Sequence, residues 1–269
     1  SIAQPPPLPP TNISSQYGGD FEINLSWNPS TSASIVKYLI YRDITEDPTT
    51  LIDSTNGQTV FNDSGLVHGQ EYHYRIRAVN IGNVKSNFSS ETSLLLTRAI
   101  NVPSDYSTIQ AGLNTANLGD TVLVQPGTYT ENIIWPETNG IKLLSVGDSS
   151  NTIIDGGGVS SVIYMNPQSA TIDTTTLIQG FKITNGGNVS FGGGMFISNA
   201  HPTISVTVIS GNTSNEHGGG IYISGNPIIN KSSVLSNNAM SSGGGLYIDG
   251  SPTINNSTIL SNYSGGNGG

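Results

Sequence analysis

Residues able to act as catalytic acids or bases are sparse after Arg98. No further arginine occurs, and the lysines are Lys142, Lys182 and Lys231. The acidic residues stand singly, with no Asp-x-Asp or Asp-Asp pair: Asp105, Asp120, Glu131, Glu137, Asp148, Asp155, Asp173, Glu216 and Asp249. Hydrolysis of a glycosidic bond calls for two carboxylates in one site. The sequence therefore indicates no catalytic residues, and we expect the residues given not to form an enzyme.

Several of these acids have a local structural explanation. Asp155 precedes three glycines and Asp249 precedes one, and Asp is a common residue in such turns. Glu216-His217 is a lone acid–histidine pair before a glycine triplet, which favours a solvated loop. The absence of cysteine excludes disulfides and thiolate metal sites. We expect no metal and no cofactor, and no cluster of carboxylates supports a Ca²⁺ site.

Aromatic side chains, in contrast, recur at a constant position. Phe196, Tyr222 and Tyr247 follow three glycine triplets by the same offset, and Tyr164 is a candidate fourth member. Strand alternation turns the isoleucines beside Tyr222 inward and Tyr222 outward. Stacked coils then form a column of outward rings, which we call the aromatic ladder. Such a row binds sugar rings or a protein partner, or it is a packing stripe that stabilises neighbouring coils.

The elements that position this ladder repeat every 25 residues. Gly-Gly-Gly-Ile-Tyr-Ile at 218–223 returns as Gly-Gly-Gly-Leu-Tyr-Ile at 243–248. The same step relates Ile204, Ile229 and Ile254, for which we expect one core column, and it relates Asn212, Asn237 and Asn262. Each repeat holds short β-type runs and no helical run, which predicts a parallel β-solenoid with coils about 4.8 Å apart. The three asparagines should then form a structural ladder of amide hydrogen bonds.

Two segments resemble a known superfamily. Val-Ile-Ser-Gly-Asn at 208–212 and Ile-Leu-Ser-Asn at 259–262, each ahead of glycines, are similar to the repeats of polymorphic outer-membrane proteins. These belong to the pectin-lyase-like, right-handed parallel β-helix proteins. The resemblance implies that fold for residues 99–269, with repeats of about 25 residues over 177–269. It leaves function open, because the superfamily includes lyases, hydrolases, esterases, adhesins and tailspikes.

The start of this domain resembles the amino-terminal cap of such helices. The matching residues are Thr-Ile-Gln at 108–110 and Gly-Asp-Thr-Val at 119–122, within a cap spanning 104–130. Apolar spacing predicts a short amphipathic helix within 105–116, with Ser107 or Asp105 as the N-cap. A cap is needed because the first coil otherwise exposes its core and its strand edge.

The amino-terminal part reads as a separate all-β domain. Residues 1–10 form a Pro-rich arm, which is either an extended linker or a segment held against the protein. Alternating strands over 11–98 predict a β-sandwich. Trp27, Leu66 and Tyr72 resemble the core Trp, the Leu and the corner Tyr of fibronectin type III domains. This resemblance implies a spacer or docking role.

Composition limits the partners. The chain has 269 residues, of which 10% are charged, and a net charge of −9, which argues against nucleic acid and against anionic membrane surfaces. No apolar run is long enough to span a membrane. Ser1-Ile2-Ala3-Gln4 is typical of the tail of a secretory signal or of a point just after signal cleavage, so we expect a secreted, extracellular or cell-surface protein.

The combined prediction is an all-β chain, a fibronectin-III-like sandwich plus a right-handed parallel β-helix with a short N-terminal capping helix. The first functional hypothesis is a structural or adhesive protein. The strand expected after Gly268-Gly269 is absent, so head-to-tail self-association through this edge and the arm at 1–10 would build a filament or surface layer. The alternatives are a fragment of a polysaccharide-degrading enzyme with further coils, or a carbohydrate-binding module that uses the aromatic ladder. The expected partners are therefore a second copy or an extracellular polysaccharide.

Overall fold

The computed structural model describes residues 5–269, which form two compact units, one ending at Arg98 and one beginning at Ala99. We call the first unit the sandwich and the second the solenoid. Residues 1–4, which include the expected signal-cleavage segment and the first part of the arm, lie outside the described residues. The described chain is all-β apart from one short helix, as expected.

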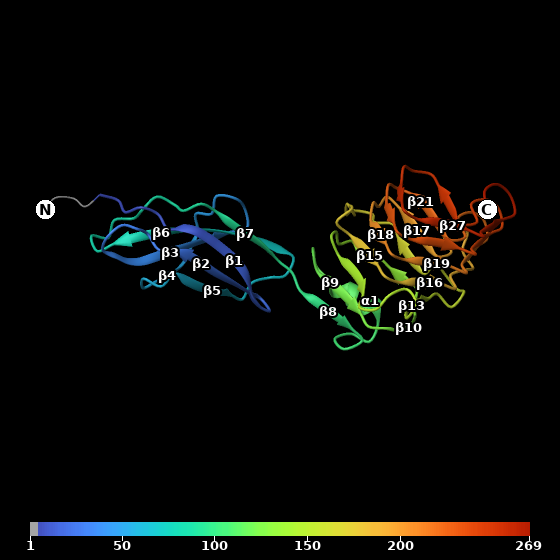
Figure 1. Ribbon diagram of the computed structural model, residues 1–269, viewed down its shortest axis with the longest axis horizontal. Helices are drawn as coiled ribbons and strands as arrows, with labels where there is room; N and C mark the ends of the chain where they lie inside the picture. Colours follow the sequence, from blue (N-terminus) through green and yellow to red (C-terminus); the bar gives the residue numbers. More distant parts are fainter. Residues whose placement is uncertain (1–4) are drawn as a thin grey trace. The chain divides into compact units, whose positions relative to one another are not determined.

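The sandwich consists of two antiparallel sheets (Figure 1). The strands of the first, in spatial order, are β1 (Thr11–Gly19), β2 (Glu22–Asn28) and β5 (Val60–Ser64). Those of the second are β4 (Leu51–Thr55), β3 (Ile35–Asp43), β6 (Gln70–Asn80) and β7 (Thr92–Leu96). Trp27 lies in the core between the sheets. The Tyr72 hydroxyl accepts a hydrogen bond from the Val67 N–H at 2.9 Å, so the expected corner tyrosine is present.

The described part of the Pro-rich arm is held against its own unit. The Leu8 N–H donates to the Ser32 hydroxyl at 2.8 Å, and the Ser30 hydroxyl donates to the Leu8 carbonyl at 2.7 Å. Pro7 and Pro10 are buried. Between the two alternatives for the arm, residues 5–10 therefore favour the segment held against the protein.

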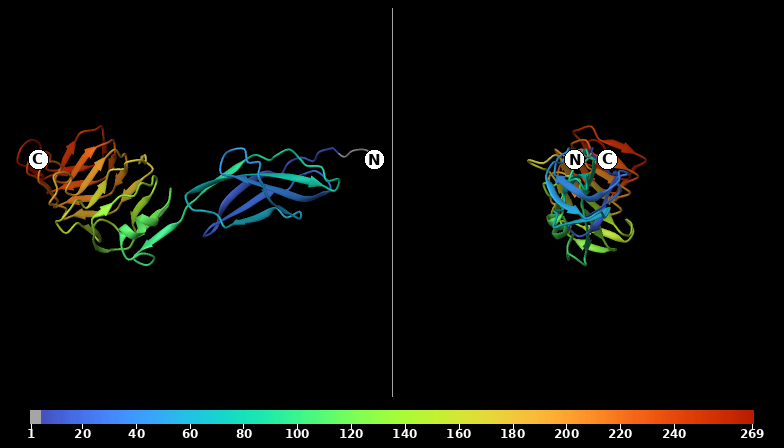
Figure 2. Two further views of the ribbon diagram at one scale, coloured as in Figure 1. Left: turned by 180° about the vertical axis from the view of Figure 1, so that it is seen from behind. Right: turned by 90° about the vertical axis from the view of Figure 1, so that its left-hand side faces the viewer.

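The solenoid is built from parallel strands stacked in sheets (Figures 1 and 2). The longest sheet holds β8 (Ala99–Val102), β9 (Thr121–Val124), β12 (Lys142–Ser145), β15 (Leu177–Gln179), β18 (Thr203–Ser205), β22 (Ile228–Asn230) and β26 (Thr253–Asn255). The second holds β10 (Gly127–Thr130), β13 (Thr152–Asp155), β16 (Lys182–Thr184), β19 (Val208–Ser210), β23 (Ser233–Leu235) and β27 (Thr258–Leu260).

Two further sheets complete the coils. The third, which carries the aromatic ladder, holds β11 (Ile133–Ile134), β14 (Ile163–Met165), β17 (Met195–Ser198), β21 (Ile221–Ser224) and β25 (Leu246–Ile248). The shortest holds β20 (Thr213–Ser214), β24 (Asn238–Ala239) and β28 (Tyr263–Ser264).

The register follows the 25-residue step. Ile204, Ile229 and Ile254 are paired in successive strands, and the first two are buried. The expected core column is therefore confirmed. Each coil buries few apolar groups by itself, so the core exists only because neighbouring coils stack.

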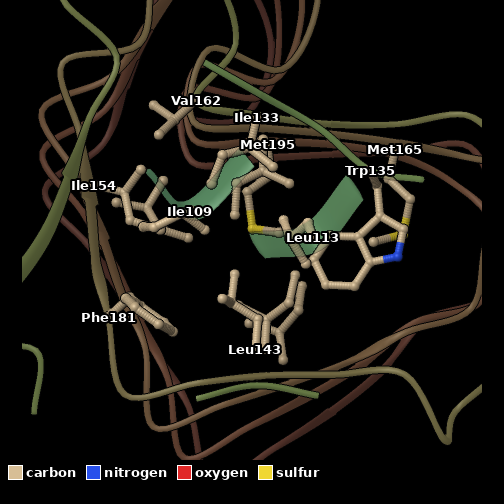
Figure 3. Packing of buried hydrophobic residues seen from close by; sticks show 14 of the residues in the cluster. Ile109, Leu113, Ile133, Trp135, Leu143, Ile154, Val162, Met165, Phe181 and Met195 are labelled. Carbon is tan, nitrogen blue, oxygen red and sulfur yellow. The ribbon is translucent and has the colours of Figure 1, made fainter. Parts of the chain in front are cut away.

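The first coil is covered by the helix α1 (Ile109–Thr115). Ile109 and Leu113 point into the interior, where Leu113 lies beside Trp135 and Ile109 lies towards Ile154 (Figure 3). The helix begins later than expected, because Thr108 rather than Ser107 or Asp105 is its N-cap. The Thr108 hydroxyl accepts from the Ala111 N–H at 3.1 Å, which satisfies a free donor of the first turn.

The glycine triplets provide close turns before the third sheet. Gly218 and Gly243 both have φ of +68°, which side chains with a β-carbon disfavour. At Gly220 a β-carbon would lie 2.5 Å from the carbonyl oxygen of Gly245 on the next coil. The triplets therefore let consecutive backbones approach closely enough to place the following aromatic residues in register.

Candidate binding face of the solenoid

The aromatic ladder forms on the outer face of the third sheet. Strand pairing places Tyr164, Phe196, Tyr222 and Tyr247 opposite one another in succession. Successive ring centroids lie 4.9, 5.1 and 5.3 Å apart, and the ring planes are within 7° of parallel. The structure thus brings together all four residues selected from the sequence, and the flanking isoleucines of Tyr222 are buried.

This geometry decides which part of each ring is accessible. Parallel rings with centroids about 5 Å apart must overlap face to face, because rings lying side by side need a wider spacing. The inner members therefore present ring edges to the outside, and Tyr164 stands at the end of the stack nearest the capping helix. Burial, and then the negative charge of Asp249, raise the pKa of Tyr222 above its ordinary value.

A second column of rings, which the sequence analysis did not identify, packs beside the ladder. Phe191 stacks on His217 at 5.7 Å, and His217 stacks on Tyr247 at 4.4 Å. The Nδ1 atom of His217 is buried without a hydrogen-bond partner among residues 5–269. The expected solvated loop therefore holds for Glu216, which is exposed, whereas His217 is a half-buried, packed ring. The sequence did contain a pattern that predicts this second column, because Phe191 and His217 each stand directly before a glycine triplet.

The asparagine ladder also forms, at a turn near the ends of the second-sheet strands. The Asn212 side-chain Nδ2 donates to the Asn237 Oδ1 at 2.9 Å, and Asn237 Nδ2 donates to Asn262 Oδ1 at 3.0 Å. Each Nδ2 also donates to a carbonyl of the preceding coil, Ile183 for Asn212 and Ile209 for Asn237. These buried amides hold the coil spacing at which the aromatic rings stack.

Two solenoid carboxylates, those of Glu137 and Asp155, accept structural hydrogen bonds. Glu137 accepts from the backbone N–H groups of Gln168, Ser169 and Ala170 at 2.7–3.0 Å. These bonds, the one from Gln168 foremost, lower the pKa of Glu137 to about 2. Asp155 accepts from the Gly157 N–H and from Asn185 Nδ2, in keeping with its expected role in a turn.

Two clefts flank Tyr164, the exposed end of the ladder. The first has about 540 Å³ and lies between the capping helix and the coil that follows it; we call it the cap cleft. The second has about 300 Å³ and is lined by Ser160, Ser161 and Phe191 among others; we call it the serine cleft. Both volumes fall in the range of small-ligand sites. Amide residues that the sequence analysis did not select line the cap cleft.

Metal binding has no candidate in the described part of the chain. Residues 5–269 bring together no group of three or more His, Cys, Asp or Glu side chains that could hold an ion. Over the same residues, no helix has the length and apolarity needed to cross a lipid bilayer.

Comparison with known proteins identifies the sandwich. Residues 8–94 match the fibronectin type III domain, and this unit is such a domain. An Fn3-like protein from Clostridium thermocellum is 27% identical, with a TM-score of 0.31, over 34% of this chain and 93% of that one. The twitchin kinase region from C. elegans is 25% identical (TM-score 0.31, 34% of this chain), and a β-1,2-glucanase from Parabacteroides distasonis is 20% identical (TM-score 0.31, 34%).

The extent of these similarities is limited. The chain spans only 17% of the twitchin region and 13% of the glucanase. No curated protein matches the sequence. Among these comparisons, only the family match says what any part of the chain is, and it covers residues 8–94.

Proposed function

We propose that the chain is an extracellular or cell-surface adhesive protein whose solenoid binds polysaccharide at the aromatic face. In this proposal the fibronectin type III domain is a spacer or docking module. The single observation that supports it is the continuous stack of outward rings from Tyr164 to Tyr247, which ends between two clefts. Aromatic rings framed by hydroxyl and amide groups match the alternating apolar and polar surface of a sugar.

Adhesion fits the chemistry of this face better than catalysis. Glu137, the carboxylate at the cap cleft, stays ionised down to a pH of about 2, so it does not donate a proton at neutral pH. Glycosidic hydrolysis uses a carboxylic acid of raised pKa together with a second carboxylate. The alternative of a fragment of a polysaccharide-degrading enzyme would need a carboxylic acid of raised pKa and a second carboxylate together in one site.

Binding without turnover is the direct test. The purified chain is mixed with insoluble neutral polysaccharides and with pectin, and the bound protein is measured after sedimentation. Reducing and unsaturated sugar ends are measured in the same supernatants. We expect sedimentation with a neutral polysaccharide and no release of product. Failure to bind any polysaccharide would remove the adhesive proposal, and product release that depends on Glu137 or Asp155 would replace it with an enzyme.

Self-association is a second candidate, supported by the apolar surface of the last coil. Ile259 is 45% exposed and Leu260 is 61% exposed, whereas Val234, in register with Ile259 on the preceding coil, is buried. An exposed strand edge is a template for another strand, whether that of a further coil of a longer chain or, in this proposal, that of a second copy. Since residues 5–10 already pack within their own unit, this version of the proposal does not use the arm.

The self-association proposal is tested by light scattering over a range of protein concentrations. We expect the mass to rise with concentration and the rise to be weaker in Leu260→Lys, which places a charge on the exposed edge. Lys substituted at exposed Val67 of the sandwich is the matched control. A constant monomer mass for the unaltered chain at every concentration would contradict self-association.

A further inference from the structure

The cap cleft is assembled from three parts of the chain that are distant in sequence. Gln110 and Asn114 come from α1, Asn132 and Glu137 flank β11, and Tyr164 and Asn166 lie at and just after β14. Four of these six side chains are amides and one is an aromatic ring. This set offers hydrogen-bond donors, acceptors and an apolar surface within one cleft, which is the combination that small polar ligands require.

The aromatic part of the cleft is the end of the ladder. Tyr164 is stacked on Phe196 on one side, while its partner in register on the preceding coil is the aliphatic Ile134. Tyr164 is 39% exposed and Ile134 is 65% exposed. The Asn166 Nδ2 group donates to the Tyr164 hydroxyl at 3.2 Å, which fixes the ring. Tyr164 is therefore the ladder member best placed to contact a ligand with its ring, and it is already oriented.

Hydrogen bonds within the protein orient the amide side chains of the cleft and leave some of their donor and acceptor atoms free for a ligand. The Ile134 N–H donates to Gln110 Oε1 at 2.7 Å, and Gln110 Nε2 donates to Asn114 Oδ1 at 2.8 Å. Asn114 is exposed, and its Nδ2 has no protein partner among residues 5–269. Asn132 donates through Nδ2 to backbone carbonyls, including that of Gly156 at 3.1 Å, which leaves its Oδ1 as an acceptor. Asn114 thus offers an oriented amide donor to the cleft, and Asn132 offers an oriented acceptor.

The charge of the cleft selects between classes of ligand. Among the residues that line the cap cleft, only Glu137 carries a charge at neutral pH. Three hydrogen bonds from backbone N–H groups keep its carboxylate negative. No lysine, arginine or histidine lines the cleft. A carboxylated sugar would meet a like charge without a compensating cation, which is unfavourable. The cleft is therefore suited to a neutral ligand.

We propose that the cap cleft binds one residue of a neutral oligosaccharide, with the sugar ring against Tyr164 and hydroxyl groups on Asn114 and Asn132. This inference rests on the proposed polysaccharide binding and names its site and ligand class. The serine cleft lies on the other flank of Tyr164 and provides Ser160, Ser190 and Phe191 for the next sugar residue. The bound glycan then runs across the coils beside the ladder rather than along the flat of its stacked rings.

Calorimetric titration of the full chain tests the site. The probes are neutral gluco-, manno- and galacto-oligosaccharides and a galacturonate oligosaccharide of the same length. We expect at least one neutral series to bind and the galacturonate to bind about tenfold more weakly. Tyr164→Ala should weaken the neutral ligand by about tenfold, and Asn114→Ala by about fivefold. Tyr164→Phe keeps the ring and should retain most of the affinity.

The controls separate this inference from the proposed function. Tyr263→Ala removes another exposed tyrosine, on the last coil, and should leave binding unchanged. Neutral binding that neither Tyr164→Ala nor Asn114→Ala weakens would overturn the cap cleft and leave polysaccharide binding intact. Equal or tighter binding of galacturonate would overturn the neutral class, and no binding of any glycan would remove both proposals. Should Tyr164→Ala fail to fold, Asn114→Ala, at an exposed helical position, decides the outcome.

Discussion

The sandwich and the solenoid solve the same problem, a buried polar group, in different ways. In the sandwich, the Asp63 carboxylate accepts from Arg42 Nη1 at 2.9 Å and from the Tyr74 hydroxyl at 2.7 Å. Three different residue types, distant in sequence, meet once. In the solenoid, one residue type repeats, and each asparagine hydrogen-bonds to the next copy of itself. The first arrangement is a local network, and the second is a chain that grows by one member with each coil.

This difference determines how far the effect of a single substitution extends through the structure. A lost partner in the sandwich network leaves one charge or hydroxyl unsatisfied at one point. A lost member of a repeat affects the coil before it and the coil after it, because a solenoid is stabilised by contacts between neighbours. We therefore expect substitutions of repeated solenoid residues to have the larger effects, confined to their own unit because the two units have separate cores.

The largest effect is expected for Ile229→Asp. Ile229 is buried between Ile204 and Ile254. The substitution would bury a carboxylate among the apolar side chains of three adjacent coils, where it has no partner. Hydrogen exchange read by mass spectrometry should show loss of protection throughout the neighbouring coils, with the sandwich still protected. Ile248→Asp, at an exposed position of the last coil, is the control. Equal protection in Ile229→Asp and the unaltered chain would contradict the core column.

The second effect is the loss of one member of the asparagine ladder. Asn237→Ala removes the acceptor of the Asn212 N–H and Nδ2 and the donor to the Ile209 carbonyl, all in buried positions. The free energy of unfolding of the solenoid should fall by about 3 kcal/mol, because buried partners are left unsatisfied. Asn255→Ala, at an exposed position, should change it little. Similar denaturant midpoints for the two variants would show that the ladder contributes little to stability.

The regular coils were predictable from the sequence and the irregular ones were not. Where the step is 25 residues, as from Tyr222 to Tyr247, like residues predicted the register without further information. Thirty residues separate Ile134 from Tyr164, and thirty-two separate Tyr164 from Phe196. Loops of unequal length break the period there, so the pairing had to come from the structure.

The cap cleft lies in that irregular region. Its amides follow no repeat, and bringing α1 beside Asn132 and Asn166 depends on loop conformations that composition does not encode. The helix start was misjudged for a related reason: Asp105, Ser107 and Thr108 are all capable of capping, and only the backbone path selects Thr108. Three ladder rings were found from their shared offset and Tyr164 was only a candidate fourth, and the mutual overlap of the rings, hence the importance of Tyr164, is a matter of side-chain geometry.

A smaller, pH-dependent effect is expected in the sandwich. Burial, and then the hydrogen bond to Asp63, raise the pKa of Tyr74. The folded state therefore keeps this proton when the unfolded chain would lose it, so this contribution is complete below a pH of about 10 and falls as the pH rises further. Tyr74→Phe should cost about 2 kcal/mol at neutral pH and flatten the loss of sandwich stability above pH 10. An unchanged alkaline slope in denaturant melts of Tyr74→Phe would contradict this assignment.

The smallest effect is expected for Glu137→Gln in the solenoid. The stabilisation by Glu137 is lost at low pH, whereas that by Tyr74 is lost at high pH. The backbone N–H groups of Gln168, Ser169 and Ala170 favour the carboxylate and lower the pKa of Glu137 from 4.5 to about 2. The stabilisation is present above pH 4.5 and is lost as the pH falls towards 2. Glu137 is exposed, so solvent screening keeps the effect at neutral pH small. Thermal melts of Glu137→Gln at pH 7 and pH 2.5 should differ less than those of the unaltered chain.

The matched control for this last prediction is Glu216→Gln, which removes the same charge from an exposed carboxylate that accepts no hydrogen bond among residues 5–269. If both variants show the acid sensitivity of the unaltered chain, the backbone cradle of Glu137 does not stabilise the coil. Glu137→Gln also bears on the cap cleft, because removing the negative charge of that cleft should bring the affinity for galacturonate closer to that for the neutral glycan. A change in melting behaviour without a change in this selectivity would assign Glu137 to stability alone, and the cleft would then need another origin for its preference.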